Sequence, residues 1–223
     1  MSDVYTSAPT PAFRLIPSRF PPLGLFDTVA TAADLAAVME LAGWTNDPLV
    51  AERVARLPEN DWVYGRANAS IVMAAFLHVA PGGMRFNGAD LGAWSASAAL
   101  NTAVVEVAHH LRREAVARGV AHVRRNFRTY TSALAGSYLD IRGQQLVRPD
   151  IYASDSYTAS QALGESIRAA GGAGLIYNSV RHVGGVNLVA HRPRNVLDLI
   201  QTDHYEVAVT AAASRIELSK LNT

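Results

Sequence analysis

The sequence predicts an α+β fold, arranged as one well-buried domain with an N-terminal extension. Stretches with helical and with strand character follow one another without a long strand–helix–strand repetition and without an internal repeat. A chain of 223 residues buries one sizeable core and leaves too little for a second full domain. We therefore expect residues 1–60 to form an arm and a helical extension, packed on a core domain of residues 61–223.

The composition excludes several classes of function. A formal net charge of +1 provides no concentrated basic face, so neither a nucleic-acid nor a membrane partner is expected. The absence of cysteine excludes a disulfide framework, a thiolate nucleophile and a cysteine-ligated metal. The first residues lack the pattern of a signal peptide, and no apolar run reaches the roughly 20 residues that span a bilayer. These features predict a cytoplasmic protein.

Residues 1–27 are expected to form an extended arm that lies over the body. They hold five of the ten prolines, and proline lacks a backbone donor and disfavours regular helix. The segment is too apolar for a free tail and should pack on the core through Leu15, Ile16, Phe20, Leu23, Leu25 and Phe26.

Two short helices are predicted after the arm. The first is capped by Thr31 or Asp27 and ends at Gly43, where a left-handed residue is easily accommodated. The second covers residues 48–57, with Asp47 as its cap and a proline at the first helical position. Both helices are interpreted as structural.

The middle of the chain contains its clearest helix. Before it, the apolar run over residues 70–77 fits a buried strand or a buried helix equally well, and a short strand is expected at 93–96. The helix then begins at Asn101 or Thr102 and is closed by Gly119.

The remaining chain is interpreted as strands and one further helix. That helix begins at a Thr158 cap and is broken by Gly171 and Gly172. Residues typical of strands flank it, over residues 123–134, 138–141, 175–180 and 187–190, with a closing pair of strands between residues 205 and 218.

Three separated pieces of sequence carry residues suited to chemistry. Arg85 lies in a glycine-bounded loop, and arginine is the side chain best suited to binding a phosphate with two donors. Glu106 and His110 are four residues apart and share one helix face, so they can address one ligand. Ser179 lies near the end of a predicted strand and precedes a pair of glycines. The sequence has no dinucleotide-binding glycine motif, phosphate loop, zinc-protease motif or serine-nucleophile elbow.

Each piece also has a purely structural interpretation. An arginine in a loop is usually a surface charge, His110 can be a core histidine with its hydrogen bonds satisfied, and a serine beside a strand is more often structural. Glu106 is the most informative of these residues, because a carboxylate buried among alanines and valines needs a cationic partner or ligand.

The order and spacing of these pieces resemble the RES domain, a family named for its arginine, glutamate and serine. The resemblance covers residues 62–210 and rests on Arg85-Phe86-Asn87, on Gly92-Ala93-Trp94-Ser95-Ala96-Ser97, on Thr102-Ala103-Val104-Val105-Glu106 and on Gly174-Leu175-Ile176-Tyr177-Asn178-Ser179-Val180-Arg181.

The resemblance implies a fold related to ADP-ribosyltransferases, with a central split β-sheet and flanking helices. It implies NAD as the substrate, cleaved at the bond between nicotinamide and ribose, with inorganic phosphate as a possible co-substrate and no metal. The family's arginine, glutamate and serine fall on Arg85, Glu106 and Ser179. The resemblance implies that Arg85 binds phosphate and that Glu106 faces the developing ribose cation. Ser179 would bind either phosphate or the ribose. A histidine one turn after the glutamate falls on His110, and further residues expected to line the NAD pocket are Asn87, Ser95, Tyr177 and Arg181.

Members of the family are typically toxins of bacterial toxin–antitoxin pairs, so the resemblance also implies partners. A helix-turn-helix (Xre-like) antitoxin is expected, together with growth inhibition through loss of NAD and a homodimer within the complex. Two other functions stay open: ADP-ribosyl transfer to a protein, and a catalytically weak protein that only binds the antitoxin. Ser95 bears on the last of these, because many members carry a tyrosine at that position.

Overall fold

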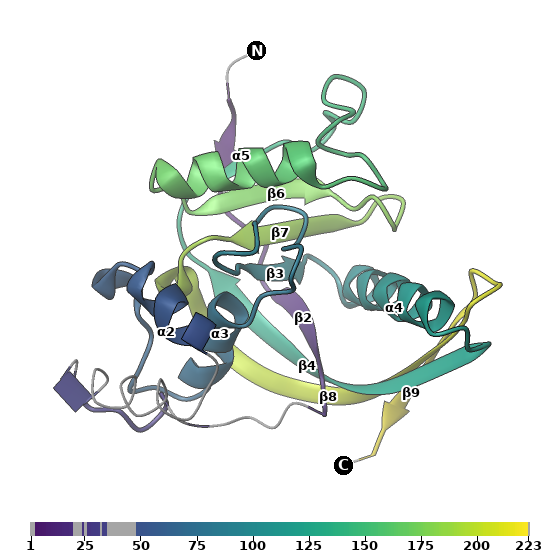
Figure 1. Cartoon of the computed structure of the whole chain (residues 1–223), viewed down its shortest axis with the longest axis horizontal. Helices are drawn as coiled ribbons and strands as arrows, with labels where there is room; N and C mark the ends of the chain where they lie inside the picture. Colours follow the sequence, from purple (N-terminus) through teal and green to yellow (C-terminus); the bar gives the residue numbers. More distant parts are fainter. Residues whose placement is uncertain (1–2, 20–23, 25, 32, 35–47, 223) are drawn as a thin grey trace.

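A computed structural model describes residues 3–19, 24, 26–31, 33–34 and 48–222, and their strands form one sheet covered by helices (Figure 1). The strand order is β1-β5-β6-β7-β3-β2-β4-β8-β9, and all neighbours are antiparallel except the parallel pair β5 and β6. The strands are β1 (Tyr5–Thr6), β2 (Ala12–Pro17), β3 (Trp94–Ser97), β4 (His122–Leu134), β5 (Tyr138–Asp140), β6 (Gly174–Asn178), β7 (Val186–Ala190), β8 (Val196–Thr210) and β9 (Ile216–Leu221).

Helices cover both faces of this sheet. They are α2 (Pro48–Ala55), α3 (Ala69–Leu77), α4 (Leu100–Ala117) and α5 (Thr158–Ala169), with short 3-10 turns η1 (Glu59–Asp61) and η2 (Pro193–Asn195). In β6 and β7, Ile176 and Leu188 pack with α3, whereas the alternate residues Leu175 and Val189 pack with α5. Leu15 of β2 packs with α4. Figure 1 shows α5 along β6 and α4 beside the long strands β4 and β8.

The apolar run over residues 70–77 is the helix α3. Asp27 fixes its start, because the Asp27 carboxylate accepts hydrogen bonds from the backbone N–H groups of Asn68 at 2.9 Å and Ser70 at 2.8 Å. Seven of the nine helix residues are buried, so the helix has almost no polar face. A helix without an amphipathic period cannot be distinguished from a buried strand by its sequence pattern.

The N-terminal segment differs from the predicted arm. Residues 12–17 form the internal strand β2, which pairs with β4 over six residue pairs from Ala12↔Ser132 to Pro17↔Phe127. Proline occurs within this strand only at its last position, so the preceding five residues keep their backbone donors. The prediction that this segment lies over the body is therefore wrong for β2. Assignment of residues 1–60 and 61–223 to two domains stays a prediction.

Two half-sheets meet at β2 and β3. The strands β1, β5, β6, β7 and β3 form one half, and β2, β4, β8 and β9 form the other. A single residue pair, Phe13↔Ser97, joins them in the described part of the chain. The predicted split sheet is not confirmed, since the strands form one continuous sheet, but its backbone pairing is weakest at this junction.

Most other predicted elements are found with shifted ends. The helix α4 is followed by Gly119 in a left-handed conformation at φ +65°, as expected for a helix end. Helix α5 has Tyr157 rather than Thr158 at its N-cap position, and β8 begins at Val196, earlier than predicted. Thr31 accepts a hydrogen bond from the backbone N–H of Asp34, and residues 33–34 are helical, but residues 35–43 of the predicted helix lie outside the described residues. No helix in the described ranges is long and apolar enough to cross a membrane.

Removal of residues 1–19 should abolish cooperative folding. The deletion takes out β2 and leaves without partners the backbone donors and acceptors of β4 that face β2, although β4 keeps its pairing with β8. We expect a protein without a cooperative thermal transition by circular dichroism, whereas removal of residues 1–4, which precede β1, should leave the transition within a few degrees of the full chain. A cooperative transition in the longer deletion would contradict the role given to β2.

Candidate functional site

Arg85 lies at the tip of a tight turn. Met84 and Asn87 form a bridge, with the Met84 N–H donating to the Asn87 carbonyl oxygen at 2.9 Å, so that Arg85 and Phe86 are the two central residues. Gly83 has φ +70°, and a Cβ there would lie 2.3 Å from the Asn87 carbonyl oxygen, so only glycine fits. Phe86 is 1% exposed and Asn87 is 1% exposed. These two buried neighbours anchor the turn.

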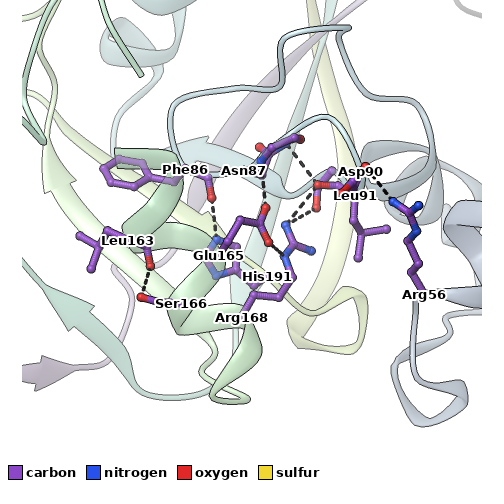
Figure 2. Close-up of polar contacts among 12 residues, drawn as sticks. Arg56, Phe86, Asn87, Asp90, Leu91, Leu163, Glu165, Ser166, Arg168 and His191 are labelled. Atoms are coloured by element: carbon purple, nitrogen blue, oxygen red, sulfur yellow. Dashed lines mark hydrogen bonds and ion pairs between the residues drawn. The ribbon is translucent and has the colours of Figure 1, made fainter. Parts of the chain in front are cut away.

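One face of α5 holds the loop that carries Arg85. The Gln161 amide donates to the carbonyl oxygens of Gly82 at 2.8 Å and Met84 at 3.0 Å. Glu165 accepts from the backbone N–H of Gly88 at 2.8 Å, and Arg168 donates to the Gly92 carbonyl oxygen at 2.8 Å (Figure 2). These side chains are spaced by four and three residues, which places them on one side of the helix.

Two further contacts bring the turn close to the scaffold. At Gly164 of α5 a Cβ would lie 2.0 Å from the Phe86 carbonyl oxygen, so the loop backbone approaches the helix where no side chain intervenes. The same oxygen lies 3.1 Å from Nε2 of His191 (Figure 2). Burial lowers the pKa of His191 to about 3, with the positive charge of Arg168 adding to the effect. The ring is therefore neutral, and Nε2 carries the proton that it donates to Phe86.

The guanidinium of Arg85 is oriented by backbone and ring contacts. Its Nη1 donates to the carbonyl oxygens of Ile151 at 3.2 Å and Ala153 at 2.8 Å, and its central carbon lies 4.7 Å from the centre of the Tyr157 ring. Within the described ranges Arg85 forms no ion pair with a carboxylate. The other donors of the guanidinium remain for a ligand.

Glu106 is held by two hydrogen bonds to one of its oxygens. Oε1 accepts from the Ser179 hydroxyl at 2.7 Å and from the Asn187 amide at 2.6 Å. Asn187 is oriented in turn, because its Oδ1 accepts from the Ser97 hydroxyl at 2.7 Å. The side chains come from α4, the loop after β6, β7 and β3. Two strands and one loop thus fix one carboxylate of α4.

Ser179 organises the loop after β6. Its Oγ accepts hydrogen bonds from the backbone N–H groups of Arg181 at 3.1 Å and His182 at 2.9 Å, which directs the hydroxyl proton towards Glu106. The Ser179 N–H donates to the Gly185 carbonyl oxygen at 2.8 Å and closes the loop. The serine therefore acts on the site through Glu106.

A cavity of about 280 Å³ lies where the two half-sheets meet. Seven of the eight residues predicted from the sequence line it, and Ser179 is the exception because it lies behind Glu106. The seven are Arg85, Asn87, Ser95, Glu106, His110, Tyr177 and Arg181. The Asn87 amide is already engaged with the carbonyl oxygens of Gly88 and Leu91, so Asn87 shapes the loop more than it offers donors to the cavity.

Arg14 lines the cavity but was missed by the sequence analysis. Its Nη1 donates to the Ser95 carbonyl oxygen at 2.8 Å, and its central carbon lies 4.6 Å from the centre of the Trp94 ring. Burial lowers the pKa of Arg14 to about 10, so the side chain stays charged at neutral pH. Its position between Phe13 and Leu15, in a segment interpreted as an arm, gave no signal of this role.

Two other contributors were also missed. Asn187 is 3% exposed, and a single amide in an otherwise apolar strand was the available signal. Tyr157 precedes α5, and nothing in the local sequence indicated that Arg85 would stack on its ring.

Burial and nearby charges set the protonation of other groups at the site. The pKa of His110 is lowered mainly by loss of contact with water, although part of the residue is exposed, and Glu106 opposes the shift. Burial raises the pKa of Tyr177 above its usual range, with the negative charge of Glu106 adding to the effect. At neutral pH Tyr177 is therefore an uncharged phenol.

The cavity carries an excess of positive charge. Arg14, Arg85 and Arg181 line it, and Glu106 is the one carboxylate among the described lining residues. None of the three arginines forms an ion pair with a carboxylate of the described chain. Partly buried cations without counter-ions favour bound anions. The site is therefore suited to a ligand that carries negative charge and that has, beside this charge, a group that Glu106 can contact.

Comparison with known proteins identifies one family. The family model described as the RES domain matches residues 53–210, a stretch that contains Arg85, Glu106 and Ser179 but excludes β2 and Arg14. No curated protein matches the chain.

Replacement of Gly164 by alanine should destabilise the protein. Alanine normally stabilises a helix interior relative to glycine by about 0.5–1 kcal/mol. At this position the new methyl group would overlap the Phe86 carbonyl oxygen, so we expect a net loss of about 1–3 kcal/mol and faster amide exchange in the loop over residues 82–92. Thermal unfolding and hydrogen exchange measure both effects. The exposed Ser166→Ala on the same helix is the control, and a Gly164→Ala protein as stable as the control would contradict the close contact.

His191 should make the protein less stable in mild acid. Its pKa is about 3 in the folded state and about 6.5 when unfolded, so between these values the unfolded state binds more protons. The stabilisation is complete above about pH 6.5 and is lost as the pH falls towards 3. In His191→Gln, whose amide can still donate to Phe86, urea unfolding should show a flatter pH dependence over this range. An unchanged slope would refute the neutral buried imidazole.

Proposed function

The chain therefore belongs to the RES-domain family, and we propose that it is an enzyme that cleaves NAD at the bond between nicotinamide and ribose, with water or phosphate as the acceptor. One observation carries the proposal. Glu106 is fixed by Ser179 and Asn187 at the wall of a cavity whose other charged lining residues are mainly arginines without carboxylate partners.

Cleavage of this bond needs a fixed negative charge beside the sugar. As the bond to nicotinamide lengthens, the ribose develops oxocarbenium character, and a pre-oriented carboxylate stabilises it without reorganising at the moment of reaction. Both hydrogen bonds that Glu106 accepts from Ser179 and Asn187 go to Oε1, so in the described part of the chain Oε2 is left for the substrate. In this mechanism Ser179 and Asn187 are positioning residues for Glu106.

The arginines suit the diphosphate of the dinucleotide. A diphosphate diester carries two negative charges, and guanidinium groups bind phosphate oxygens through paired donors. Arg85 is already pre-oriented by two carbonyl oxygens and the Tyr157 ring, and Arg14 by Ser95 and Trp94. Because both guanidinium groups are held before the ligand arrives, binding orders few side chains and loses less affinity.

An aromatic wall limits the access of water to the reacting bond. Phe86 and Tyr177 pack edge to face with ring centres 4.7 Å apart, and Val189 lines the cavity beside them. The neutral phenol of Tyr177 adds no charge that would compete with Glu106. We propose that the nicotinamide ring leaves from this wall, where an uncharged product is not held by the arginines.

As the biological role we propose the toxin of a toxin–antitoxin pair, in which loss of NAD inhibits growth until a helix-turn-helix antitoxin binds. Membership of the RES-domain family supports this role. ADP-ribosyl transfer to a protein uses the same cleavage step and differs only in the acceptor, so product analysis separates the two activities.

Glu106→Gln should abolish most NAD cleavage while keeping the fold. The amide has the shape of the carboxylate and can still accept from Ser179, but it lacks the negative charge, so we expect kcat to fall by about 10²–10³-fold. Nicotinamide release measured by liquid chromatography gives the rate, and thermal unfolding checks the fold. The exposed Glu217→Gln on β9 is the matched control and should retain full activity.

The products identify the acceptor in the same experiment. With labelled NAD, soluble ADP-ribose or its phosphate indicates hydrolysis or phosphorolysis, whereas a labelled protein band in cell extract indicates transfer. Equal rates in the wild type and Glu106→Gln would refute the assignment of Glu106, and absence of NAD consumption in the wild type would refute the proposed enzyme.

A further inference from the structure

A second cavity adjoins the one that contains Glu106. It has a volume of about 680 Å³ and lies between α4, the N-terminal end of α5 and the two glycines, Gly82 and Gly83, that precede the Arg85 turn. Two residues, Tyr157 and Arg181, line both cavities. A ligand in the first cavity can therefore extend past these side chains into the second.

The size of the first cavity requires such an extension. Pockets that enclose drug-sized ligands have volumes of about 300–1,000 Å³. The first cavity, at about 280 Å³, lies at the lower end, whereas a dinucleotide has two bases, two sugars and two phosphates. A substrate that places its reacting sugar beside Glu106 must continue elsewhere, and the adjoining cavity provides the space.

The second cavity is lined by basic side chains. His109 and Arg113 are four residues apart on α4 and face it together, and Arg181 lies across from them. Asp155 is the one carboxylate among its described lining residues. In the described chain neither arginine forms an ion pair with a carboxylate, and Arg181 is held by the Ser154 carbonyl oxygen at 2.5 Å.

The surroundings of His109 indicate the sign of the local potential. Burial lowers the pKa of His109 to about 4, and the charges of Arg181, His110 and Arg113 add to this effect, whereas Glu106 opposes it. Positive charges thus lie near the His109 side chain on two elements, with Arg113 on α4 and Arg181 in the loop after β6. Helix α5 adds to the same potential, because its N-terminal end lies at the cavity and the Tyr157 side chain does not cap it.

We propose that the second cavity is a phosphate-binding subsite in which Arg113 and Arg181 bind a phosphate group next to the site of Glu106. The proposal rests on the proposed function and extends it to residues outside the first cavity. Two sources supply the same chemistry: the adenylate half of the dinucleotide, or free inorganic phosphate. In the second case a phosphate oxygen bonds to the anomeric carbon, and the electron pair of the broken bond neutralises the nicotinamide nitrogen.

Equilibrium binding to the full-length protein tests the subsite without turnover. AMP and inorganic phosphate are titrated separately by calorimetry into the wild type, Arg113→Ala and Arg181→Gln. We expect each substitution to weaken binding of at least one probe by about ten- to a hundredfold, because a charged hydrogen bond is lost. Arg118→Ala, an exposed arginine on the same helix, should bind like the wild type.

The two probes distinguish the source of the phosphate. Tighter binding of AMP that depends on Arg113 assigns the cavity to the adenylate half, and then Arg113→Ala should raise KM for NAD but not for nicotinamide riboside, which has no phosphate. Binding of inorganic phosphate that depends on Arg113 and is not exceeded by AMP assigns the cavity to a free phosphate. Unchanged binding of both probes in both folded variants overturns the subsite. A subsite confirmed by titration in a protein that does not consume NAD would refute the proposed function alone.

Discussion

The junction between the two half-sheets determines where the cavity that contains Glu106 lies. Backbone pairing between β2 and β3 is reduced to Phe13↔Ser97, and the Arg14 side chain replaces part of the missing ladder by donating to the Ser95 carbonyl oxygen. Stacking on Trp94 holds the guanidinium in the gap. If β2 and β3 were fully paired, their backbones would fill this space. The reduced pairing between the two strands therefore explains both the weak junction and the cavity. The side chain that closes the junction also supplies charge to the site.

The scaffold holds the two main chemical groups by different means. Arg85 depends on α5, whose polar side chains bind the backbone of the loop, so the sequence of the loop needs only glycines and a buried Phe86 to adopt its turn. Glu106 lies on a rigid helix and is oriented by side chains from the opposite half-sheet, Ser179 and Asn187. Both sets of hydrogen bonds join elements that are far apart in the sequence. The distance between Arg85 and Glu106 is thereby fixed by tertiary packing, as a pre-organised site requires.

The sequence predicted local features better than those formed by distant pairing. The α4 helix and the shared face of Glu106 and His110 follow from a strong period and a closing glycine, and both are confirmed. The strand β2 was missed because its evidence is non-local: Arg14 and Ser95 are 81 residues apart, whereas the nearby prolines favoured an irregular arm. The role of Ser179 as a support of Glu106 also needed the fold, since the spacing of the two residues carries no information about which one faces the cavity.

The resemblance to the RES domain implies a departure at Ser95, where many members carry a tyrosine, and the structure limits what such a departure changes. Arg14 binds Ser95 through its main-chain oxygen, and β7 pairs with it through the backbone at Val189, so neither contact depends on the side chain. In the described chain Glu106 is held by Ser179 and Asn187, and neither hydrogen bond involves Ser95. A serine offers no aromatic ring on which a ligand could stack, while Glu106, Arg14 and Arg85 are held by contacts that do not use the Ser95 side chain. We therefore expect this difference to affect ligand binding more than the position of Glu106.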